Sequence, residues 1–263
     1  MKRLCLLLVF AFSHLCTRAQ SSGTPEFESD RPDRTEASTI VPRGYWQLET
    51  GFEYERARKE GNWTKAWMYP QGLLRVGLSS RAELRLETSF ERENTYYSDL
   101  VPHTQTEKGL YQTRVGGKLN VMQAKGATPE VTLMAMAELP WGNKNFTPRH
   151  LAPEIRLLFT NKISQKVKLQ YNAGYRHQNE DGHMEDDLEY TVSVSDKVTK
   201  KFMVFAEFFG AKAVHMHARN QIDGGLMYML LPNLQLDTII GTGISADTPE
   251  LFVGGGVSVR LPR

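Results

Sequence analysis

A strict alternation of apolar and polar residues, repeated along the chain, constrains the fold more than any other feature. In the stretch Tyr45–Glu55, the even positions are apolar or aromatic apart from Thr50, and the odd positions include three glutamates. Successive side chains of a β-strand point to opposite faces, so this stretch predicts a strand with one apolar and one polar face. A soluble sheet explains one such strand, but the pattern recurs throughout the chain. That repetition is typical of a closed transmembrane barrel with an apolar outside and a polar lumen.

Twelve segments carry the pattern, and we expect each to form one strand: Tyr45–Glu55, Trp67–Leu78, Ala82–Glu91, Tyr111–Val121, Glu130–Leu139, Pro153–Thr160, Val167–His177, Leu188–Ser195, Phe202–Gly210, Ile222–Leu230, Leu234–Gly243 and Leu251–Leu261. An even number brings both ends of a single-chain barrel to the periplasm. Starting from there, the connections alternate between short periplasmic turns, such as 79–81, and longer extracellular loops, such as 92–110. The predicted fold class is therefore all-β, a transmembrane antiparallel up-and-down barrel of about twelve strands.

The first nineteen residues have the parts of a secretory signal. Lys2 and Arg3 precede the apolar run Leu4–Ala11, and a short polar stretch ends at Ala19. We expect cleavage after Ala19 and localisation in the outer membrane of a Gram-negative cell envelope. Both cysteines of the chain, Cys5 and Cys16, lie in this leader, which excludes disulfides and thiol chemistry from the mature protein.

Residues 20–44 form the second predicted region, and residues 45–263 the barrel. Prolines 25, 32 and 42 argue against regular structure in residues 20–44, so we expect an extended periplasmic segment. Its charges alternate in sign between Asp30 and Glu36. Two interpretations stay open for this cluster, a solvated tail or a segment that folds back against the lower barrel rim.

Charge and hydropathy exclude two other classes of protein. The formal net charge of +2 becomes −1 without Lys2, Arg3 and Arg18 of the leader, so nothing favours nucleic acid as a partner. The mean hydropathy is −0.43, and no stretch beyond the leader approaches the ~20 apolar residues of a membrane helix. A barrel also has a soluble-looking average, because half of each strand faces water.

The opening of the mature chain resembles a known family. The segments Glu28–Glu36 and Val41–Phe52 look like the start of the bacterial outer-membrane family labelled "putative MetA-pathway of phenol degradation", whose members are often called transporters. Shorter similar pieces are Leu73–Gly77, Ala82–Arg85, Pro153–Arg156, Asn172–Tyr175, Phe205–Glu207 and Leu234–Asp237. The resemblance covers nearly all of the mature chain. It implies a channel or transporter for small solutes, hydrophobic or aromatic ones among the candidates.

The partners that follow are the lipid bilayer of the outer membrane, the barrel-insertion machinery and a solute of unknown identity. One departure concerns the insertion machinery. Barrel proteins often finish on an aromatic residue that this machinery reads, whereas the chain ends Leu261-Pro262-Arg263.

The polar faces of the predicted strands carry charges of both signs, which we expect to line a narrow lumen: Glu49, Glu53, Arg75, Glu83, Arg85, Glu87, Arg114, Lys118, Glu138, Glu154, Arg156, Lys168, Arg176, Glu189, Glu207, Asp223, Asp237 and Arg260. These charges either pair across strands and brace the wall, or include an unbalanced subset that selects solutes by charge. Apolar residues on the same faces form either a patch for a hydrophobic solute or a plug: Leu73, Met134, Met136, Met203, Phe205, Phe209, Met227 and Met229.

No motif links a nucleophile, a base and an orienting group, so we predict no catalytic, metal-binding or cofactor-binding residues and no enzyme. Three functions stay open. The first is a channel or transporter with a narrow charged lumen, and the second is a plugged structural or surface-binding barrel without transport. The third is an outer-membrane hydrolase.

Overall fold

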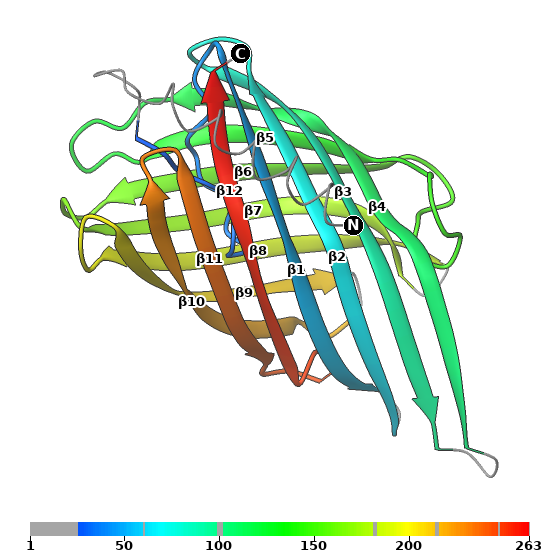
Figure 1. Ribbon diagram of the computed structural model, residues 1–263. Helices are drawn as coiled ribbons and strands as arrows, with labels where there is room; N and C mark the ends of the chain where they lie inside the picture. Colours follow the sequence, from blue (N-terminus) through cyan, green and yellow to red (C-terminus); the bar gives the residue numbers. More distant parts are fainter. Residues whose placement is uncertain are drawn as a thin grey trace, which may run out of the picture.

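Twelve strands form a closed barrel in the described part of the computed structural model, which comprises residues 26–59, 61–98, 102–180, 183–213, 216–246 and 248–262 (Figure 1). The predicted signal peptide lies outside these residues. The strands are β1 (Tyr45–Lys59), β2 (Asn62–Gly77), β3 (Ala82–Tyr97), β4 (His103–Met122), β5 (Glu130–Glu138), β6 (Ala152–Lys162), β7 (Val167–Glu180), β8 (His183–Lys197), β9 (Phe202–Ala213), β10 (Arg219–Leu231), β11 (Leu234–Gly243) and β12 (Leu251–Pro262).

Each strand pairs antiparallel with the next, and β1 pairs with β12 to close the barrel. The closing register runs from Tyr45 opposite Pro262 to Arg56 opposite Leu251. Both chain ends of the barrel therefore lie at one end, which we call the terminal end, and the opposite end is the distal end. Closure leaves no unpaired strand edge. The predicted all-β, twelve-stranded, up-and-down barrel is confirmed.

Several strands are longer than predicted, mostly toward the distal end. β3 continues to Tyr97 and β4 begins at His103, so most of the predicted loop 92–110 is a β-hairpin. β8 begins at His183, inside another predicted loop. In Figure 1 the β3–β4 hairpin extends well beyond its neighbours. Apolar residues thin out in these extensions, so alternation of apolar residues underestimates the strands, although their backbones still pair.

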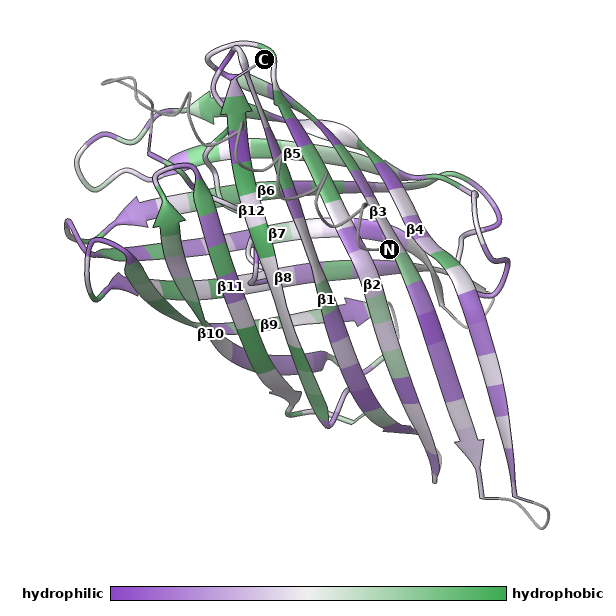
Figure 2. Cartoon of the chain, viewed as in Figure 1, coloured by the Kyte–Doolittle hydropathy of each residue, from purple (hydrophilic) through white to green (hydrophobic). Residues whose placement is uncertain are grey.

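The two faces of the wall have the polarity that the alternation predicts. On β3, Leu84 and Leu86 are exposed on the outside, with exposed fractions of 53% and 44%, whereas Glu83 and Arg85 are buried on the inside. Apolar and polar residues alternate along the strands around the barrel (Figure 2), and many of the apolar ones are exposed. A soluble protein buries its apolar residues, so this inverted arrangement indicates a lipid-facing exterior. No helix within the described ranges is long and apolar enough to cross a membrane.

The segment before β1 does not form a solvated tail or pack against the rim. Residues 26–41 run through the interior of the barrel and bond to residues of β1–β9, β11 and β12 (Figure 1). Thr35, Ser38 and Val41 are at most 1% exposed. Both interpretations that the sequence left open are therefore wrong for these residues. Their polar groups find partners on the wall, so the interior solvates the segment in place of water.

Candidate functional site

Asp30 anchors the interior segment, which we define as residues 26–41, to three neighbouring strands. One of its carboxylate oxygens lies 3.0 Å from Arg75 of β2 and 2.8 Å from Lys118 of β4, and it also bonds to Arg85 of β3. Asp30 is 6% exposed and the three cations at most 3%. Burial alone raises the pKa of Asp30, but Arg75, Lys118 and Arg85 together hold it well below the usual value. The carboxylate is therefore ionised and is the hub of a buried charge network.

The network continues on both sides of this hub. Arg75 also contacts Glu49 of β1 at 3.1 Å and Glu83 of β3 at 2.9 Å. The carboxylate of Glu36 in the segment forms ion pairs with Arg85 at 2.9 Å and with Lys118 at 3.0 Å. A buried ion pair is stable only when its remaining hydrogen-bonding positions are satisfied. Here each carboxylate that the segment contributes to this network lies beside opposite charges of the wall, although Nε of Arg85 has no hydrogen-bond partner among the described residues.

Arg31 occupies a space that two glycines leave open on β1 and β12. A Cβ added to Gly51 would lie 2.4 Å from the guanidinium group of Arg31, and one added to Gly256 would lie 2.5 Å from it. The guanidinium donates to Gln71 at 2.8 Å and lies 3.3 Å from Asp237 of β11. The glycines therefore let a long charged side chain lie flat against the wall.

The segment reaches the opposite side of the barrel at Arg34 and Thr35. The guanidinium of Arg34 lies 2.5 Å from Glu53 of β1, and the backbone N–H of Arg34 donates to Glu207 of β9 at 2.8 Å. The hydroxyl of Thr35 lies 2.7 Å from that of Thr191 on β8. Opposite walls are thus joined through one segment, which crosses the lumen.

Close backbone packing fixes the end of the segment before β1. The N–H of Val41 donates to Glu83 at 2.6 Å, and the hydroxyl of Thr132 donates to the carbonyl of Ser38 at 2.6 Å. A Cβ on Gly77 would lie 2.1 Å from the carbonyl oxygen of Pro42. Only glycine at position 77 allows the chain to turn into β1 this closely.

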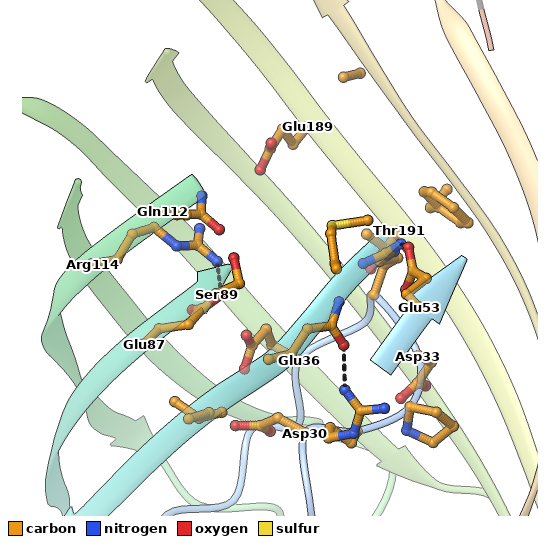
Figure 3. A pocket seen from close by; sticks show the side chains of 18 of the residues that line it. Asp30, Asp33, Glu36, Glu53, Glu87, Ser89, Gln112, Arg114, Glu189 and Thr191 are labelled. Atoms are coloured by element: carbon orange, nitrogen blue, oxygen red, sulfur yellow. Dashed lines mark hydrogen bonds and ion pairs between the residues drawn. The ribbon is translucent and has the colours of Figure 1, made fainter. Parts of the chain in front are cut away.

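A cavity of about 610 Å³ lies against the interior segment, which forms its floor (Figure 3). Asp30–Arg34 and Glu36 contribute to the floor, and side chains of eight or more strands form the walls. We call this cavity the chamber. Figure 3 shows Arg114 and Glu87 on one side of it and Glu53 with Thr191 on the other.

Three arginines and four glutamates of β3 to β8 form a charge network at one wall of the chamber: Arg114, Arg156, Arg176, Glu87, Glu138, Glu154 and Glu189. Arg114 lies 2.6 Å from both Glu87 and Glu154. Arg156 contacts Glu154 at 2.7 Å, and Arg176 contacts Glu138 at 3.1 Å. Arg156 and Glu154 lie on the same strand, whereas the other pairs link strands that are neighbours or next neighbours in the wall, so they brace it without the segment.

The opposite side of the interior is acidic. Glu53 and Glu55 line the chamber on β1, and Asp33 of the segment lies near Glu207 and Asp223. Asp223 is buried beside Glu207. Burial, followed by the charges of Glu207 and Asp223, raises the pKa of Asp33 well above its usual value. Within the segment, the pKa of Asp30 is therefore lowered, whereas that of Asp33 is raised.

Fifteen of the eighteen charged residues that we expect to line the lumen fall into three groups in the structure. Contacts with the interior segment or its anchoring network involve Glu49, Glu53, Arg75, Glu83, Arg85, Lys118, Glu207, Asp237 and Arg260. Pairing along the wall involves Glu87, Arg114, Glu138, Glu154 and Arg156. Asp223 belongs to neither group. Their role toward a solute stays a prediction.

The inward apolar residues do not form one patch. Phe205, Phe209 and Met227 pack with Ile239 and Phe252 in one cluster on β9–β12. Met134 and Met136 pack with Leu158 in a second cluster on β5 and β6. Leu73 lines the chamber. Sequence reasoning missed the main occupant of the lumen, the interior segment. The alternating charges between Asp30 and Glu36 were the available signal.

Comparisons with known proteins agree with this architecture. Residues 29–261 match the family described as "Putative MetA-pathway of phenol degradation". No curated protein matches the sequence. An outer membrane channel from Pseudomonas putida F1 superposes with a TM-score of 0.67 at 10% identity, over 89% of this chain and 100% of that one.

Two further solved structures share the fold. The translocator domain of the autotransporter NalP from Neisseria meningitidis gives a TM-score of 0.53 at 8% identity, over 98% of this chain and 97% of that one. The KdgM porin gives a TM-score of 0.50 at 12% identity, over 81% of this chain and 98% of that one. None of the three is described as an enzyme. Since the family match spans nearly the whole barrel and the segment inside it, the chain belongs to the "Putative MetA-pathway of phenol degradation" family of outer-membrane β-barrels.

Proposed function

We propose that this protein is a gated outer-membrane channel, in which a small solute enters the chamber from the extracellular, distal end and passes to the periplasm when the interior segment shifts. The observation that carries the proposal is the position of this segment. It forms the floor of an open chamber and bonds to strands on all sides of the lumen. A purely structural barrel has no need of a chamber of this size above its plug.

The dimensions and the lining of the chamber support a small, polar-substituted solute. Its volume of about 610 Å³ falls in the range of roughly 300–1,000 Å³ typical of small-molecule sites. Its walls combine Tyr111, Phe209 and Leu73 with charged groups such as Arg114 and Arg156. Such a lining suits an aromatic ring that carries a hydroxyl or carboxylate better than a plain hydrocarbon, because the charged groups lose hydration next to an apolar solute. The description of the family also points to aromatic compounds.

The plugged structural barrel is the second candidate, and one observation favours it. The segment is held by a buried network around Asp30 rather than by a few surface contacts. Under this alternative the segment never leaves, and the chamber is a surface pocket without an exit.

Conductance and solute uptake separate the two candidates. The purified full chain is inserted into planar bilayers, and in parallel into liposomes that contain 4-hydroxybenzoate outside. We expect discrete conductance steps and uptake of 4-hydroxybenzoate faster than that of a sugar of similar size. Tyr111→Ala should slow the uptake of the aromatic solute, whereas the matched variant Tyr54→Ala, on the outward face, should not.

Two outcomes contradict the proposal. Bilayers that contain folded protein but show no conductance and no uptake would favour the plugged barrel. Conductance with equal uptake of the aromatic solute and the sugar would support a channel but contradict a preference for aromatic solutes.

A further inference from the structure

A row of basic residues lies on the outward face of β1 to β4, at the distal end of the barrel. Cross-strand register places Arg56 of β1 beside Lys65 of β2, and Arg58 beside Trp63. On the next pair of strands, Arg92 of β3 lies beside Lys108 of β4. We define the basic patch as Arg56, Arg58, Lys65, Arg92 and Lys108. All five share the outward face, since they alternate with inward residues such as Glu53 and Glu91.

Two aromatic rings beside the basic patch, those of Trp63 and Tyr96, contact three of its cations. The guanidinium groups of Arg56 and Arg58 lie 5.4 Å and 5.3 Å from the centre of the Trp63 ring. The ammonium group of Lys65 lies 5.0 Å from the centre of the Tyr96 ring. Cations this close to a ring face gain electrostatic attraction and lose mobility. The patch is therefore more ordered than a set of free surface lysines.

The strand residues around the patch leave its charge uncompensated. The outward positions of this face on β1–β4 carry no carboxylate among the residues that the structure describes. One acid approaches from the turn before β12, where Glu250 lies 3.7 Å from Arg56. Five cations thus face one carboxylate on a surface that belongs to the outside of the barrel. Such an excess calls for anionic partners.

The patch lies directly beyond the aromatic residues that mark the edge of the apolar band. Tyr54 and Trp67 are cross-strand partners whose rings are 5.3 Å apart, and they occupy the row of residues adjoining the patch. Below them on the same face of β1 lie Phe52 and Leu48, both exposed. Tyrosine and tryptophan concentrate where hydrocarbon meets headgroups. The basic patch therefore lies at the level of the outer-leaflet headgroups.

We propose that the basic patch binds the phosphate groups of the phosphorylated glycolipid, lipopolysaccharide, that forms the outer leaflet around the barrel. Arginine donates in pairs to phosphate oxygens, and lysine adds a point charge. Trp63 and Tyr96 keep the cations at the spacing of the strands, so several can contact one diphosphorylated headgroup. The site lies on the exterior and does not depend on the function of the chamber.

Binding of purified lipid A to the detergent-solubilised full chain tests the proposal. Native mass spectrometry compares bisphosphorylated lipid A with its dephosphorylated form on the wild-type protein. The same titration is run on the variant R56Q/R58Q/K65Q and on the control R81Q/K166Q, which removes two exposed cations from turns at the terminal end. Heat-modifiable migration on a gel verifies that each variant is folded.

We expect the patch variant to bind bisphosphorylated lipid A at least about tenfold more weakly, because each basic residue near an anionic membrane surface contributes a factor of about five. The control should stay within about twofold of wild type. The wild-type protein should bind the dephosphorylated lipid as weakly as the variant binds the phosphorylated one. Two results would overturn the proposal. In the first, the wild-type protein binds the two lipids equally. In the second, a folded patch variant binds bisphosphorylated lipid A as tightly as the wild type does.

Discussion

The terminal and distal halves of the lumen use the same kinds of side chain for different purposes. In the terminal half, Arg75, Arg85 and Lys118 direct their charges at the interior segment, through Asp30. In the distal half, Arg114 and Arg176 pair with glutamates of the wall and leave the chamber open. Both halves read alike in the sequence as alternating charged residues. The difference teaches that lumen charges brace the barrel where they meet one another and hold the interior segment in place where they meet it.

Neutralising the hub should have the largest effect on docking of the segment. Asp30→Asn removes the charge that Arg75, Arg85 and Lys118 share. We expect docking to weaken by about 3–5 kcal/mol, since breaking a buried ion pair leaves uncompensated charge. Limited proteolysis within residues 26–44 and the open fraction in single-channel records measure this. Asp33→Asn is the matched control, because burial and Glu207 raise the pKa of Asp33, so its surroundings disfavour the charge that this substitution removes. Equal effects of the two substitutions would contradict the role of the hub.

Filling the glycine space should weaken docking less. Gly51→Ala places a methyl group where the Arg31 guanidinium lies, and overpacking of this kind costs about 1–3 kcal/mol. The control is Gly72→Ala, where the nearest heavy atom to an added Cβ is 3.7 Å away. Proteolysis of the segment should accelerate in the first variant alone. Identical protection of the two variants would show that Arg31 does not lie where we describe it.

Acidification from pH 8 to pH 5 should stabilise docking modestly. The pKa values of Asp33 and Glu36 are raised in the docked segment, in both cases mainly by burial. A carboxyl with a raised pKa binds more protons when docked than when free, so docking strengthens as the pH falls through the raised value. Asp30 has a lowered pKa, so its contribution persists throughout this range and is lost only at much lower pH. The open fraction should therefore fall on acidification, and a rise would contradict these assignments.

Changing the arginine wall should affect docking least. Arg114 contacts Glu87 and Glu154 of the wall and, among the described residues, forms no hydrogen bond or ion pair with the interior segment, so Arg114→Gln should leave proteolysis of residues 26–44 unchanged. We expect instead a shift of the reversal potential in a salt gradient toward cation selectivity, because a positive charge leaves the chamber. Release of the segment by this substitution would erase the distinction between the two halves.

The barrel could be predicted from sequence because its determinant is local. Alternation along Tyr45–Glu55 or Ala82–Glu91 fixes which face meets lipid, and twelve repeats fix closure. Strand ends were predicted less well, since β3 and β4 continue as a hairpin beyond the apolar band where no apolar residues mark them.

The interior segment could not be predicted in the same way because its determinants are distant in the chain. Asp30 needs Arg75, Arg85 and Lys118, which only the barrel register brings together. By itself, a proline-containing stretch of alternating charge is typical of a solvated tail. The charges of this stretch complement those on the polar faces of the strands. That complementarity alone does not say where the stretch lies, because the charges of the wall come together only when the barrel closes.

The central claim is that the segment must move for solute to pass, and a reversible crosslink tests it most directly. The hydroxyls of Thr35 and Thr191 lie 2.7 Å apart, so cysteines at these two positions would bring their sulfur atoms close together, and the chain has no cysteine beyond Cys16. Single-channel conductance of the variant T35C/T191C is recorded oxidised and then after reduction, with each single-cysteine variant as a control. We predict closed channels when oxidised and wild-type conductance on reduction. Full conductance through the oxidised, fully crosslinked protein would contradict the account.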